Sequence, residues 1–188
     1  MKFYKLQNFI LFGIVSIIFM TPAIWNGFPL IFTDSLSYLH SGVELVAPVD
    51  RPIFYGLFTR LSNLILDLWG LLFLQSVLVI FLLLKLASIL FPDLSIKNSL
   101  IWLYLIGLTT SVPWFISQIS ADIFISCLFL TMVILALVCE RASFGNIIFL
   151  AGLMILEICM HSGNLIIGFL LFLCILSLLY VQKNLGVI

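Results

Sequence analysis

Residues 69–91, WGLLFLQSVLVIFLLLKLASILF, decide the class of fold of this chain. The run contains one charged residue, Lys85, and exceeds the roughly 20 residues that a helix needs to cross a hydrocarbon core of about 30 Å. Further apolar runs cover residues 9–24, 99–112, 121–139, 146–160 and 165–181. Hydrophobic residues make up 64% of the chain and charged residues 9%, so we expect an all-α, polytopic transmembrane helical bundle.

The length of the chain sets the number of crossings. Its 188 residues allow about six spans with short connections and one larger loop, which leaves no room for a separate soluble domain. We therefore predict a single transmembrane domain over residues 1–188. The formal net charge is zero and there is no basic tract, so nothing points to nucleic acid, and membrane lipid is the expected partner.

The larger loop, residues 26–68, separates the first two apolar runs. Thr33-Asp34-Ser35 predicts the start of a short helix over residues 35–46. The stretch 53–68 has apolar residues at three- and four-residue spacing but also contains polar and charged side chains, namely Arg60, Asn63 and Asp67. We expect an amphipathic helix that lies in the membrane interface instead of crossing it, so that the outer loop carries interfacial helices.

The distribution of Lys and Arg predicts the orientation. With the N-terminus in the cytoplasm, the basic residues on or near the inner side are Lys2, Lys5, Lys85, Lys97, Arg141 and Lys183. Only Arg51 and Arg60 then lie outside. This bias favours an N-in, C-in topology with the loop 26–68 on the outer face.

Two acids, Asp34 and Asp122, are placed at the outer end of the bundle by this topology. A local role is open for each: Asp34 has the position of a helix N-cap, and Asp50 has the same position before a second helix. Arg51 has two interpretations as well. Its side chain snorkels into lipid headgroups, or its guanidinium forms a fork of donors for a lipid phosphate.

The order of segments resembles the GT-C superfamily of membrane glycosyltransferases. Three short stretches carry the resemblance: FTDSLSYL (residues 32–39) with the first acid, RPIFY (residues 51–55) entering the interfacial helix, and SQISADIF (residues 117–124) with the second acid. The chain is also similar to the N-terminal part of uncharacterised bacterial multipass proteins. The resemblance implies a location in the bacterial inner (cytoplasmic) membrane.

The resemblance also implies a donor, a polyprenyl-phosphate-linked sugar, and roles for named residues. Asp34 is the expected general base, and Asp122 a second acid that orients the acceptor or a metal. Arg51, Tyr55 and His161 are the expected substrate-binding residues. The implied cofactor is a divalent metal, Mg²⁺ or Mn²⁺, held by Asp34 and Asp122.

Other interpretations stay open at this point. The sequence has Ser35 after Asp34 where GT-C enzymes usually have a second acid, and the chain has fewer helices than is common among them. A truncated or non-catalytic relative, or one part of an enzyme that a further subunit completes, is therefore compatible with the pattern. A small transporter would use Glu157 and His161, one helical turn apart. A structural subunit would use Asn63, Gln75 and Gln118 for interhelical hydrogen bonds.

Overall fold

The structure is a computed structural model that describes residues 2–138 and 142–184, and this part of the chain is all-helical, as predicted. Cys139 and Arg141, which the sequence places at the end of one apolar run and in the inner loop that follows it, lie outside the described residues. The helices are α1 (Lys2–Phe19), α2 (Thr21–Asn26), α3 (Ser35–Glu44), α4 (Phe54–Leu90), α5 (Ile96–Thr109), α6 (Val112–Ile116), α7 (Ile123–Val138), α8 (Phe144–Met160) and α9 (Ser162–Asn184).

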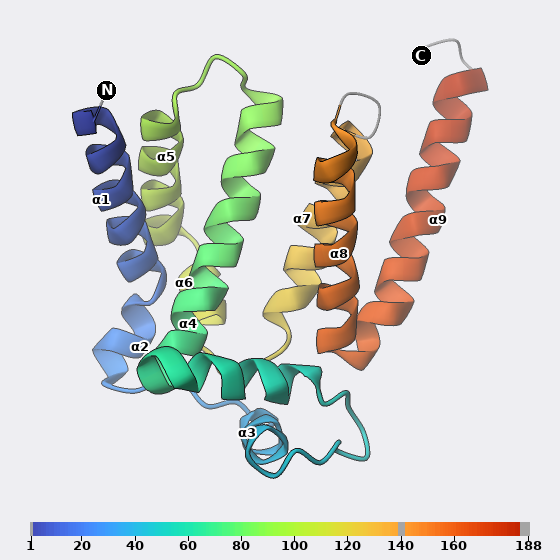
Figure 1. Cartoon of the computed structure of the whole chain (residues 1–188). Coiled ribbons are helices and arrows are strands. Elements are labelled where there is room, and N and C mark those ends of the chain that lie inside the picture. Colours follow the sequence, from blue (N-terminus) through green and yellow to red (C-terminus); the bar gives the residue numbers. More distant parts are fainter. Residues whose placement is uncertain (1, 139–141, 185–188) are drawn as a thin grey trace.

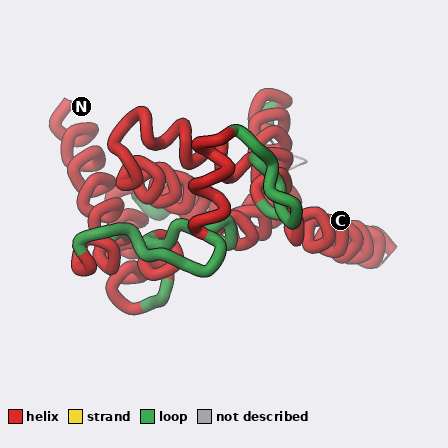
Figure 2. The backbone as a smooth tube through the Cα atoms, turned by 90° about the horizontal axis from the view of Figure 1, so that it is seen from below, coloured by secondary structure: helices red, strands yellow, loops and turns green. Residues whose placement is uncertain are grey.

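The long helices stand side by side and alternate in direction (Figure 1). Helix α1 packs on α5 and α4, α4 packs on α7, and α7 contacts both α8 and α9. The start of α1 and the end of α9 lie at one end of this bundle. The short helices α2, α3 and α6 gather at the opposite end, which we call the α3 end, and the view from below shows the loops crossing it (Figure 2).

The number of membrane crossings is not confirmed by helix length. Within the described ranges, one helical segment, Leu66–Leu90, is both long and apolar enough to cross a membrane. The other long helices contribute shorter apolar segments, Leu6–Phe19, Ile96–Thr109, Ile123–Val138, Phe144–Met160 and Ser162–Cys174. Helix α5, for example, has 14 residues, which at 1.5 Å per residue span only about 21 Å. Six spans therefore stay a prediction.

Helix α4 consists of two helices joined at a sharp bend. The backbone is non-helical at Leu66 (φ −147°, ψ 36°) and Asp67 (φ 55°, ψ −151°). The positive φ at Asp67 is uncommon for a residue with a side chain and costs about 1–3 kcal/mol. Residues 54–65 consequently run across the α3 end, while the rest of α4 turns into the bundle (Figure 1). The sequence predicted a separate helix here, and its position in a membrane interface stays a prediction.

Helix α3 lies against the crosswise part of α4 through two glycines, Gly42 and Gly56. A Cβ at Gly42 would overlap the carbonyl oxygen of Gly56, and a Cβ at Gly56 would lie 2.9 Å from Gly42 N and 3.0 Å from Tyr38 O. The contact thus brings two backbones together. Arg60 completes it, because its Nη1 donates to Gly42 O and Val43 O, each at 3.0 Å, at the C-terminal end of α3 where carbonyls lack helical partners.

This packing predicts that Gly56→Ala releases α3 from α4. The added methyl group forces the helices apart, and overpacking of this kind costs about 1–3 kcal/mol. Thermal unfolding of the purified protein, followed by circular dichroism, should show a lower midpoint. Gly13→Ala is the matched control, because a Cβ at Gly13 meets no heavy atom within 4 Å. Equal midpoints for the two variants would contradict the close approach.

Candidate functional site

Two loops from distant parts of the sequence pair at the α3 end. Leu30 N donates to Ser117 O at 2.8 Å, and Ile119 N donates to Leu30 O at 2.9 Å, which forms one parallel β-bridge between Leu30 and Gln118. Ser35 Oγ adds a buried hydrogen bond of 2.6 Å to Ile119 O. The segment that leads into α3 is thereby tied to the segment that leads into α7. Asp34 and Asp122 belong to these two segments.

The carboxylate of Asp34 does not cap α3. Asp34 occupies the N-cap position (φ −90°, ψ −11°) but makes no side-chain capping bond. The neighbouring hydroxyl of Ser35 instead accepts from Phe32 N at 2.8 Å. The capping interpretation of Asp34 is therefore wrong, and its carboxylate is available for another partner.

That partner is Arg51. Its Nη1 lies 2.8 Å from Asp34 Oδ2, and its Nη2 lies 2.5 Å from Asp50 Oδ2. The Arg51 side chain is only 15% exposed and its Cζ lies 5.1 Å from the centroid of the Tyr38 ring, a cation–π distance. Arg51 therefore does not snorkel. Asp50 does not cap the second helix either, because α4 begins at Phe54.

The ion pairs shift the pKa values of both partners. The hydrogen bond from Arg51 lowers the pKa of the Asp50 carboxyl. The hydrogen bonds to Asp50 and Asp34 raise the pKa of Arg51 above its ordinary value. Arg51 is thus a permanent cation between two carboxylates.

Tyr38 connects the two halves of the site, and the sequence interpretation missed it. The residue is 1% exposed, and burial raises the pKa of its hydroxyl. Arg51 opposes this shift, whereas the carboxylates of Asp34 and Asp122 both add to it. The charges of the two acids thus act in the same direction on one hydroxyl. The signal available in the sequence was its spacing, one helical turn after Asp34.

Tyr55 lies beside Tyr38 but is held by a different network. The two rings form an edge-to-face pair with centroids 4.6 Å apart. Tyr55 is fully buried, and its hydroxyl donates to Gln75 Oε1 at 2.8 Å. Gln75 Nε2 donates in turn to Ile116 O at 2.9 Å and Gln118 O at 3.2 Å. Tyr55, predicted to bind substrate, thus braces the crosswise helix against the loop before α7.

Asp122 and His161 form the other half of the site. His161 Nε2 lies 3.7 Å from Asp122 Oδ1, and Ser120 Oγ donates to Asp122 Oδ2 at 2.9 Å. Gly163 N donates to His161 Nδ1 at 3.0 Å. A neutral imidazole that accepts at Nδ1 carries its proton on Nε2, so His161 presents a donor towards Asp122. The side chains of His161 and Asp122 are 25% and 43% exposed, which leaves them reachable from the solvent.

The pair of Glu157 and His161 that a transporter would use does not share a helix face. Helix α8 ends at Met160, and His161 has an extended backbone (φ −144°, ψ 135°). Glu157 is fully buried, whereas His161 turns to Asp122. The one-turn spacing therefore does not bring the two side chains together.

The described residues do not form a metal cage at this site. No group of three His, Cys, Asp or Glu side chains suited to a metal ion occurs among them. The Asp34 carboxylate is paired with Arg51, and Asp122 has Ser120 and His161 as partners. The predicted Mg²⁺ or Mn²⁺ thus lacks a resident set of ligands, and no step proposed below goes through a metal.

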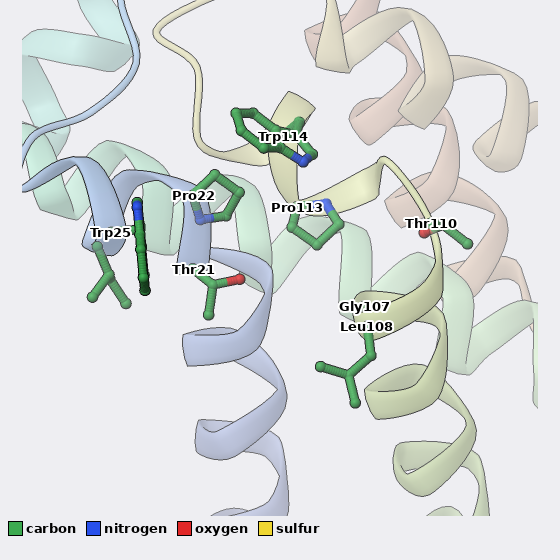
Figure 3. A pocket seen from close by; sticks show the side chains of 9 residues that line it. Thr21, Pro22, Trp25, Gly107, Leu108, Thr110, Pro113 and Trp114 are labelled. Atoms are coloured by element: carbon green, nitrogen blue, oxygen red, sulfur yellow. The ribbon is translucent and has the colours of Figure 1, made fainter.

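A separate groove of about 770 Å³ opens between α2 and the α5–α6 corner (Figure 3). Its lining includes Pro22, Trp25, Pro113 and Trp114. The two indoles are 94% and 57% exposed, respectively. The groove contains none of the candidate carboxylates, so it is not part of the charged site.

No protein-family model matches the chain, and no similar protein of curated function and no similar solved structure was found.

The network around Gln75 predicts that Tyr55→Phe destabilises the protein. The change leaves Gln75 Oε1 buried without its donor, and an unsatisfied buried polar group costs about 1–3 kcal/mol. Chemical denaturation of the purified protein measures this loss. Tyr104→Phe, in α5 and outside this network, is the control and should change stability less. A neutral Tyr55→Phe would show that the hydroxyl is not a brace.

Proposed function

We propose that this chain is an integral membrane protein of GT-C type that takes part in sugar transfer from a polyprenyl-phosphate donor on the outer face of the inner (cytoplasmic) membrane. One observation carries the proposal. The Asp34 carboxylate is free of its helix cap and pairs with Arg51, beside a tyrosine that also lies within electrostatic reach of Asp122.

The surface of the helices supports a membrane location. Large apolar side chains are exposed on the outside of the bundle, including Phe9 (76%), Ile17 (57%), Phe144 (78%) and Phe169 (61%). Contact between such surface and water costs about 25 cal/mol per Å², and monomeric soluble proteins rarely expose large apolar patches. A hydrocarbon environment removes that cost. Exposed tryptophans at the α3 end, Trp25 and Trp114, suit a membrane–water interface.

In the proposed reaction, an acceptor hydroxyl attacks the anomeric carbon of the lipid-linked sugar. The acceptor oxygen forms the new bond to that carbon, and the bond from the carbon to the phosphate oxygen breaks. The electron pair leaves with the polyprenyl phosphate, and Asp34 takes the acceptor proton as general base. A second carboxylate, Asp122, stabilises positive charge that develops on the sugar, as paired carboxylates do in glycoside chemistry.

Arg51 is the proposed partner of the donor phosphate. Its guanidinium already holds two carboxylates, and a phosphate can replace one of them with the same fork of donors. Asp50 is the partner that yields more easily, because its side chain is 63% exposed, against 36% for Asp34. The exchange would leave the Asp34–Arg51 pair intact beside the reacting bond.

Asp34→Asn should abolish sugar transfer, because an amide keeps the shape of the carboxylate but cannot accept the proton. The assay uses the protein in proteoliposomes with a panel of polyprenyl-phosphate hexoses that carry a radiolabelled sugar, and it measures label in acceptor lipid or peptide. Asp50→Asn is the matched control, because it removes the other carboxylate that Arg51 holds. It should keep at least part of the activity. Full transfer activity in Asp34→Asn would refute the assignment. So would the absence of transfer by the wild-type protein and both variants with every donor tested.

The membrane location predicts a specific labelling pattern. Val49, in the loop between α3 and α4, is fully exposed, and Asp93 is exposed in the loop between α4 and α5. In a chain without its native cysteines, Val49→Cys should react with a membrane-impermeant maleimide on intact spheroplasts. Asp93→Cys should react only after the membrane is opened. The reverse pattern would place the α3 end in the cytoplasm, and equal labelling of both would contradict a membrane-spanning bundle.

A further inference from the structure

A second polar cluster lies inside the bundle, where α7, α8 and α9 meet. Its members are Thr131, Glu157 and Asn164, one from each helix, and all three are fully buried. Thr131 Oγ1 donates to Glu157 Oε1 at 2.9 Å. Asn164 Nδ2 donates to the backbone oxygen of Glu157 at 2.7 Å. The cluster is separate from the charged site at the α3 end.

Two oxygens in this cluster lack a hydrogen-bond partner, Glu157 Oε2 and Asn164 Oδ1. Both are acceptors when Glu157 is ionised, so an ionised carboxylate leaves two buried acceptors and a buried negative charge. An unpaired ion in an apolar interior costs several kcal/mol. An ionised Glu157 would therefore need a positive charge beside its carboxylate.

The helices that pack around Glu157 place no cation beside its carboxylate. Helix α7 has no charged residue, and Glu157 is the only one in α8. The only one in α9 is Lys183, which comes 19 residues after Asn164 and so lies about 28 Å further along that helix. Lys85 of α4 lies at the other end of α8, in a pocket with Asn146. His161 is occupied elsewhere, since its Nδ1 accepts from Gly163 and its Nε2 faces Asp122. Another ionisable residue, Cys127, interacts electrostatically with Glu157 but would carry negative charge if it ionised.

We infer that Glu157 is a proton-binding site, in which the proton is carried on Oε2 of a neutral carboxylic acid whose other oxygen, Oε1, accepts from Thr131. The proton removes the buried charge and turns one unpartnered acceptor into a donor. Asn164 Oδ1 is an acceptor of the kind that such a donor requires. Intramembrane acids that are neutralised in this way are costly to retain and typically mark function.

The Glu157 site lies next to the turn that joins α8 and α9. Asn164 also donates its backbone N–H to His161 O at 3.0 Å, so the residue that clasps Glu157 shapes the turn between α8 and α9. That turn presents His161 to Asp122. The proton-binding site thus adjoins the turn that carries one residue of the charged site, and this inference does not require sugar transfer.

Dicyclohexylcarbodiimide tests the proposal, because this apolar reagent partitions into membranes and attacks protonated carboxyl groups. The full-length protein in nanodiscs should be labelled at Glu157, as identified by peptide mass spectrometry, and the yield should fall as pH rises. Glu157→Gln should lose this label completely. Asp93→Asn, which changes an exposed acid, is the matched control and should leave the label at Glu157 intact.

Infrared spectroscopy provides the second measurement, since it does not depend on access of a reagent. The wild-type protein at neutral pH should show the carbonyl band of a protonated carboxylic acid that is missing from Glu157→Gln. Absence of that band would overturn the proposal, whatever the labelling result. Protection from the carbodiimide by NaCl but not by choline chloride would also overturn it, and would assign the site to Na⁺ instead of a proton.

Discussion

The backbone pairing of Leu30 with residues 117–119 is the constraint on which the charged site depends. Both segments are non-helical and lie at the end of an apolar bundle, where unpaired backbone groups are costly. Each segment supplies backbone hydrogen-bond partners for the other. The side chains of Ser35 and Gln75 add hydrogen bonds to carbonyls of residues 116–119. A shift of one residue in this pairing would move Asp34 relative to Asp122. The register of two short loops therefore determines whether the chain has one site or two unrelated acids.

The glycine contact between α3 and α4 supplies the second half of the arrangement. Because Gly42 and Gly56 let the two backbones meet, Tyr38 reaches Tyr55 and the loop that carries Arg51 folds back over the Tyr38 ring. Arg51 then lies between Asp34 and Asp50 with little exposure to water. Two carboxylates, Asp34 and Asp50, flank one guanidinium, so this group of three side chains keeps a negative excess. This excess of negative charge favours a reaction in which a carboxylate acts as a base. A phosphate-bearing ligand has to compete with Asp50 for the Arg51 guanidinium.

The helical class and the position of most long helices could be predicted, because long apolar runs bounded by proline or polar residues determine them locally. The crosswise helix could be predicted too, since Asn63 and Asp67 interrupt an otherwise apolar stretch. The site was only partly predictable. Local sequence places a carboxylate and a hydroxyl side by side at the start of α3, and tertiary contacts with Ile119 decide that Ser35 makes the cap-like bonds. For Tyr38 the sequence offered one signal, its spacing of one helical turn from Asp34, whereas the role of Gln75 depends on contacts between distant segments that no spacing encodes.

The acids of this chain differ in how their charge is balanced, and the difference follows their depth in the bundle. Asp34 and Asp50 at the α3 end have Arg51, while Asp122 has Ser120 and the imidazole of His161. Glu157 lies among apolar helices with hydroxyl and amide neighbours and no cation. Salt bridges and water can sustain ionised groups at the solvent end, but neither reaches the interior. Because Glu157 has neither a cationic partner nor exposure to solvent, the proposal assigns the neutralisation of its charge to a bound proton.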